Sequence, residues 1–111
     1  MAELIGTFEV VVLLAILGLE DVAYGRSVLR EVQAALNRER AVTAGSVYTT
    51  LDRLETKGLL SSRLEEGTPE RGGRARRFYR LTPRGATALN DARYTLDKLW
   101  QGKPWPLEIL T

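Results

Sequence analysis

The chain has 111 residues, of which 44% are hydrophobic and 27% charged, with a formal net charge of +2. These values predict one globular domain with a modest core and exclude a disordered chain. The sequence contains no cysteine and no histidine, which excludes disulfides, thiolate metal sites and the usual hydrolase triads. We therefore expect no enzyme activity, no metal and no cofactor.

The N-terminal end shows no sign of membrane insertion or secretion. No basic segment precedes the first apolar stretch, so a secretory signal is not expected. That stretch, Val10–Leu17, has eight residues, well short of the roughly 20 that span a bilayer. We expect a cytoplasmic protein without a membrane partner.

Two helices are predicted in the first third of the chain. The segment Thr7–Leu17 is apolar around nearly its whole circumference, which is typical of a helix buried on most sides. A break at 18–21 separates it from a second helix at about Ala23–Asn37. The second helix has one apolar stripe at helical spacing, formed by Tyr24, Val28, Leu29, Val32, Ala35 and Leu36.

A third helix, Gly45–Lys57, is predicted from its signals at both ends. Thr43 or Ser46 can cap its start, and Gly58 follows its end. Its apolar positions are Val47, Leu51 and Leu54. With the short turn at 38–42, the second and third helices fit a helix-turn-helix.

A β-hairpin is expected next. Leu59–Leu64 and Arg77–Leu81 are predicted to be strands, with a glycine-rich tip at 65–74 between them. Because the hairpin follows a helix-turn-helix, it is predicted to be the wing of a winged helix. The predicted fold is mainly α with a small β-hairpin (α+β).

The last predicted helix begins with Thr82 as cap and Pro83 in its first turn. The tail after it, with Trp105, is also apolar. The three-helix unit and wing already supply one core, so we expect the stripe of this last helix to pack against a second copy of the chain. The predicted dimer interface comprises Leu89, Ala92, Leu96, Leu99 and Trp100. Residues 1–84 are then the winged helix-turn-helix and residues 85–111 the dimerisation helix and tail.

Positive charge is concentrated in the wing. Residues 59–84 carry seven arginines and three glutamates, a net charge of +4, whereas residues 1–37 carry a net charge of −3. Because arginine binds phosphate through paired donors, DNA contacts are predicted at Arg71, Arg74 and Arg76. Arg77 and Arg80 lie on a strand, where their stems can instead pack on the sheet.

The start of the third helix carries the second group of candidates. On a helix whose apolar side chains face the core, the polar ones point outward, and the first residues of a recognition helix meet bases and phosphates. The candidate DNA-binding residues here are Thr43, Ser46, Tyr48, Thr49 and Arg53. The alternatives are a half-buried Tyr48 and an Arg53 that serves only the helix surface.

Three segments carry a family resemblance. Ala23-Tyr24-Gly25, the segment Gly45–Leu60 and the segment Gly73–Gly85 resemble the PadR family of winged helix-turn-helix transcriptional regulators, in its short subfamily without a separate C-terminal domain. The resemblance covers roughly residues 5–100. It implies a homodimeric repressor that binds palindromic operator DNA and dimerises through the C-terminal helix with help from the N-terminal one.

Two further expectations depend on this resemblance. Some family members bind flat aromatic compounds between subunits, which makes Trp100 and Trp105 candidates for effector binding; the alternative is that both rings belong to the dimer core. Winged helices also act as protein-interaction modules without DNA, and the modest net charge of +2 leaves that alternative open.

Overall fold

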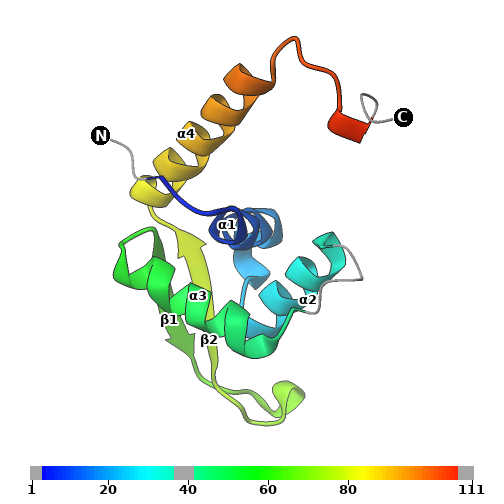
Figure 1. The fold of residues 1–111 in the computed structure, drawn as a ribbon. Helices are drawn as coiled ribbons and strands as arrows, with labels where there is room; N and C mark the ends of the chain where they lie inside the picture. The colour runs from blue at the N-terminus through cyan, green and yellow to red at the C-terminus, as the bar shows by residue number, and fades with distance from the viewer. Residues whose placement is uncertain (1–3, 37–41, 108–111) are drawn as a thin grey trace.

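A computed structural model describes residues 4–36 and 42–107, apart from the side chain of Arg71. The order of its elements is helix, helix, helix, strand, wing, strand, helix, as predicted, and the fold is mainly α with a two-stranded antiparallel hairpin. In Figure 1 the tip of the wing and the C-terminal end of the last helix lie at opposite ends of the molecule. The longest dimension is 54 Å.

Helix α1 spans Thr7–Leu19 and is longer than predicted. Gly18, where the sequence predicted a break, lies inside the helix, and the residue that stops it is Glu20 with φ 53° and ψ −119°. This backbone conformation is strained for a residue with a Cβ. A short 3₁₀ turn, η1 (Glu20–Val22), follows.

Helices α2 (Gly25–Ala35) and α3 (Ala44–Thr56) form the helix-turn-helix pair. Helix α2 is shorter than the predicted Ala23–Asn37, because residues 23 and 24 are extended and pair with the hairpin. Most of the predicted turn at 38–42 lies outside the described residues, but the Gln33 amide donates a hydrogen bond to the carbonyl of Val42 at 3.2 Å. That bond ties α2 to the start of the next segment.

The wing consists of β1 (Leu60–Glu65) and β2 (Arg76–Leu81), in a register that pairs Leu60 with Leu81 and Glu65 with Arg76. A 3₁₀ turn, η2 (Pro69–Arg71), lies in the tip. Phe78 and Tyr79 point to opposite faces of β2 and are both buried. The base of the wing is therefore covered on both sides.

Helix α4 (Pro83–Trp100) begins as predicted, with the Thr82 hydroxyl accepting from the N–H of Gly85 at 3.0 Å. A Cβ on Gly85 would lie 2.0 Å from the carbonyl oxygen of Leu59, so only glycine allows this approach. Leu89 belongs to the core of its own chain, unlike the rest of the stripe predicted to lack a partner. Beyond it α4 projects away from the body (Figure 1).

The core joins all of these elements. It contains Val12, Leu13 and Ile16 of α1, Val28 and Val32 of α2, the predicted stripe of α3, and residues of both strands. Ala35, predicted as part of the α2 stripe, is exposed. In the part of the chain that the structure covers, no helix is both long and apolar enough to cross a membrane.

Candidate nucleic-acid interface

An open groove of about 620 Å³ lies between the start of α2, the exposed face of α3 and the side of the wing formed by its tip and β2. Four arginines and one aspartate line it, a formal balance of +3. Positive charge in a concave surface raises the local concentration of phosphate groups. The full lining is Tyr24, Gly25, Arg26, Tyr48, Asp52, Gly72, Arg74, Ala75, Arg76, Arg77 and Tyr79.

The hydroxyls at the start of α3 are used to hold the helix. Thr43 is the N-cap and accepts from the N–H of Ser46 at 3.0 Å, while the Ser46 hydroxyl donates to the carbonyl of Thr43 at 2.8 Å. The Thr50 hydroxyl donates to the carbonyl of Ser46 at 2.8 Å. Thr43 and Ser46 are exposed as predicted, and both fix the backbone of the turn that a ligand would meet.

Tyr48 is 42% exposed and lines the groove. Its ring lies against the start of α2, where a Cβ on Gly25 would come within 3.0 Å of the ring. Tyr48 is therefore exposed on the groove side and packs against α2 on the other. Thr49 and Arg53, further along the same helix, are exposed.

The wing arginines differ in how they are held. Arg74 is exposed on the groove, whereas Arg76 is half-buried, with its guanidinium carbon 4.2 Å from the centre of the Tyr24 ring. The predicted contact at Arg71 lies outside the described side chains. The geometry therefore brings Arg74 and Arg76 to the same groove as Tyr48.

Arg77 takes part in a hydrogen-bonded chain across the hairpin. It donates to the Ser62 hydroxyl at 3.0 Å, and that hydroxyl donates to the Glu55 carboxylate on α3 at 2.6 Å. Burial raises the pKa of the neighbouring Tyr79 hydroxyl, and the carboxylates of Asp52 and Glu55 raise it further. Tyr79 is thus a neutral structural group, and Arg77 helps to fix α3 on the sheet.

Lys57 at the end of α3 forms an ion pair with Glu9 of α1 at 2.9 Å. Glu9 is buried and also accepts from the N–H of Gly6 at 3.1 Å. Burial alone raises the pKa of Glu9, but the hydrogen bonds from Lys57 and Gly6 and the charges of Lys57 and Arg53 lower it, with a net downward shift. This pair links α1 to the candidate recognition helix and occupies the Lys57 ammonium.

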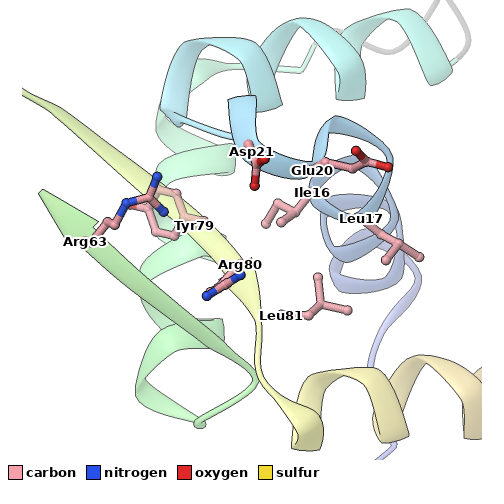
Figure 2. Close-up of a pocket in the computed structure, with 8 residues that line it drawn as sticks. All are labelled: Ile16, Leu17, Glu20, Asp21, Arg63, Tyr79, Arg80 and Leu81. Carbon is pink, nitrogen blue, oxygen red and sulfur yellow. The ribbon is translucent and has the colours of Figure 1, made fainter. Parts of the chain in front are cut away.

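A second hollow, of about 380 Å³, lies where the end of α1 meets the hairpin. Figure 2 shows the carboxylates of Glu20 and Asp21 on one side and the guanidinium groups of Arg63 and Arg80 on the other. These four charges sum to zero, and Arg63 is already paired with Glu65 at 2.9 Å. The first groove is therefore the better surface for a polyanion.

Apolar side chains gather at the other end of the molecule. Leu14 and Leu17 of α1 and Leu96 of α4 are all more than half exposed and border a hollow of about 490 Å³ between the two helices. Leu99 is 62% exposed. Trp100 and Trp105 meet edge to face, with ring centres 5.5 Å apart.

Sequence reasoning does not single out the contributions of Tyr24, Gly25 and Arg26 to the groove. Periodicity places Tyr24 in the apolar stripe of α2, and Gly25 enters only as part of a motif. A glycine next to Tyr24 at the start of a helix is a signal in the sequence that another element packs closely on the backbone there, because glycine has no Cβ. Which element approaches follows only from the fold.

Known proteins resemble this chain in sequence and in fold. A transcriptional regulator of Mycobacterium tuberculosis, Rv3488, is 48% identical over 58 residues, which are 52% of this chain and 50% of that protein, so the match spans about half of each. Among solved structures, a PadR-like transcription factor from Bacteroides fragilis has a TM-score of 0.67 and 28% identity, covering 85% of this chain and 84% of the other.

A PadR family transcriptional regulator from Eggerthella lenta has a TM-score of 0.63 and 27% identity, covering 82% of this chain and 75% of the other. The model of the PadR-like family of transcriptional regulators matches residues 13–91, which include α2, α3 and the whole wing. The chain therefore belongs to the PadR-like family of transcriptional regulators, as its motifs predicted.

Proposed function

We propose that this protein is a homodimeric transcriptional repressor that binds a palindromic operator through α3 and the wing. The observation that carries the proposal is the groove beside α3, where four arginines and one aspartate surround Tyr48. Such a dimer would repress by covering an operator that overlaps the DNA a polymerase needs.

In this proposal α3 enters the major groove with its exposed side chains toward the bases. Tyr48, Thr49 and Arg53 are the contacts, and the capped turn at Thr43 and Ser46 faces the phosphate backbone. Arg74 and Arg76 bind phosphates from the wing. Fixed donors at both edges of the groove would set the register of the duplex.

A second copy is proposed to cover the apolar end. Exposed leucines on both α1 and α4 border one hollow, and Leu96 and Leu99 are each more than half exposed. A contiguous apolar surface of this kind favours association, because its burial stabilises by about 25 cal/mol per Å². Ala92 and Trp100 would join that interface, with Leu89 supporting it from the core of its own chain.

A small aromatic effector is proposed to bind beside Trp100 and Trp105 and to release the DNA. Both rings are accessible, at 46% and 66% exposure, and they already contact each other. Planar dyes titrated against tryptophan fluorescence test this step. Quenching that saturates supports an effector site, whereas unchanged fluorescence at saturating dye contradicts it and supports rings that only form the dimer core.

DNA binding itself is tested by the fluorescence anisotropy of labelled duplex DNA over a range of salt concentrations. The proposal predicts that the logarithm of the affinity falls linearly with the logarithm of the salt concentration, because arginines that bind phosphates release counterions from the DNA. The protein-interaction alternative predicts no binding to any duplex, even in low salt. That result would exclude the proposed function.

A further inference from the structure

Tyr24 holds two parts of the molecule together at the edge of the groove. It is the residue before α2, and its backbone forms an isolated β-bridge with Phe78 on β2. The N–H of Tyr79 donates to the carbonyl of Ala23 at 2.8 Å. The ring of Tyr24 also packs on the ring of Phe78, with the two ring centres 5.5 Å apart. The position of Tyr24 is therefore fixed relative to the base of the wing.

Two arginines from different elements contact the side chain of Tyr24. The Arg76 guanidinium from β2 stacks over the ring at 4.2 Å, and Arg30 of α2 donates to the Tyr24 hydroxyl at 3.4 Å. Of these, Arg76 lines the groove together with Tyr24. Tyr24 thus supports one of the arginines that line the proposed DNA-binding groove.

Stacking leaves the arginine able to bind phosphate. A guanidinium contacts a ring through its flat face, while its five N–H donors lie in the plane and stay available for bidentate bonds. The other stacked arginine of the hairpin, Arg63 over Phe78 at 5.2 Å, already pairs with Glu65. Among the described side chains, no ion pair to Arg76 is found. Of these two arginines over rings, Arg76 is therefore the one whose N–H donors remain available to a phosphodiester.

We propose that Tyr24 is a positioning residue for DNA binding, which holds the Arg76 guanidinium over its ring at the edge of the groove so that the N–H donors are available to a backbone phosphate. The proposal depends on the function proposed above. A long side chain loses much of its rotamer freedom when it binds a ligand, and an arginine already ordered on a ring loses less. Tyr24 therefore acts on affinity through Arg76, without touching DNA itself.

The test is a double-mutant cycle in DNA affinity, with a duplex selected from random DNA and the full chain. Tyr24→Leu removes the ring and should weaken affinity roughly two- to fivefold, the range of an exposed cation–π contact. In an Arg76→Ala background the same substitution should cause no further loss. Tyr24→Phe keeps the ring and should retain nearly full affinity.

Tyr94→Leu is the matched control, because Tyr94 also lies near a cation, Lys98 at 5.8 Å, but is located on α4 away from the groove. It should leave DNA affinity unchanged. Arg76→Lys tests the contact without altering Tyr24, and should weaken binding because an ammonium lacks the flat, bidentate donor plane. Circular dichroism checks that each variant is folded.

The outcomes separate the two proposals. If the unaltered protein binds no duplex, the proposed function fails and this inference fails with it. If the unaltered protein binds and the losses from Tyr24→Leu and Arg76→Ala add, Tyr24 acts only on the fold, and the positioning role alone is overturned. Unchanged affinity in Arg76→Lys, or a loss in Tyr24→Phe as large as in Tyr24→Leu, overturns it as well.

Discussion

The two ends of this molecule expose different chemistry. At the wing end, the arginines Arg63 and Arg76 lie on aromatic rings of their own chain. At the α4 end, Leu96, Leu99 and Trp105 are each more than half exposed. Ordered cations favour reversible binding of a charged ligand, whereas exposed leucines favour a stable protein–protein interface. The comparison indicates one end for DNA and the other for a second copy.

The largest expected effect is on dimer affinity, when the apolar end of α4 is made polar. Leu96→Glu with Leu99→Glu should raise the dissociation constant of the dimer roughly a hundredfold or more, because both copies would bury unpaired carboxylates in place of leucines. Analytical ultracentrifugation measures the change. Since both leucines are exposed in the single chain, the fold should persist.

Lys98→Glu is the matched control for that pair. It changes the net charge by the same amount, −2, but lies about 200° around the helix from Leu96. It should remain a dimer. A double-glutamate variant that still sediments like the unaltered protein would contradict the assignment of the apolar end.

The next effect concerns the charged end. Arg74→Ala with Arg76→Ala should lower the slope of log affinity against log salt by roughly two, about 0.9 for each phosphate that is no longer neutralised. Anisotropy titrations at several salt concentrations give the slope. Arg93→Ala, on exposed α4, should leave it unchanged. An unchanged slope in the double variant would show that these arginines do not bind phosphates.

A smaller effect, on the free energy of unfolding, is expected at the Glu9–Lys57 pair, which belongs neither to the groove nor to the apolar end. Glu9→Gln should cost about 1 kcal/mol of unfolding free energy at neutral pH. The pKa of Glu9 is lowered from 4.5 in the fold, so this contribution is present above about pH 4.5 and is lost as the pH falls through the lowered value. Urea unfolding at about pH 7 and pH 3 should show the difference between Glu9→Gln and the unaltered protein closing at the acid end. A difference of equal size at both pH values would argue against the ion pair.

The smallest and most selective effect is expected at Gly25. A Cβ there would crowd the Tyr48 ring at 3.0 Å, so Gly25→Ala should shift the tyrosine and weaken DNA binding a few-fold. Stability should change little, because alanine lowers the entropy of the unfolded chain. Gly18→Ala is the control, since a Cβ at Gly18 meets nothing within 4 Å. Thermal unfolding and anisotropy measure both variants; equal DNA affinities for the two would contradict the role of Gly25.

The sequence predicted those parts of the fold that depend on local signals. The starts of α3 and α4 follow from caps at Thr43 and Thr82, which act within one turn. The end of α1 was misplaced because a glycine inside a helix and a glycine at its end look alike in sequence. Here the stop is the strained Glu20.

Part of the candidate site was predictable from the sequence, namely its residues on α3 and the wing, but neither the contribution of Tyr24, Gly25 and Arg26 nor the arrangement was. Exposed hydroxyls and arginines follow from periodicity and charge. The contacts of Tyr24 with Arg76 and of Glu9 with Lys57 join residues far apart in the chain. They depend on how α2 meets the wing and α1 meets α3, which only the packed core determines. The packing of Leu89 into the core of its own chain was likewise not predictable, and the sequence assigned this residue to the dimer interface with the rest of its stripe.

In vitro selection of duplex DNA from a random pool tests the central claim most directly. If two copies pair through α1 and α4 and present two α3 helices, the selected sites will be inverted repeats, with half-sites about 10 base pairs apart from centre to centre. A single unrepeated motif would contradict the dimer on DNA, and no enrichment at all would contradict DNA binding.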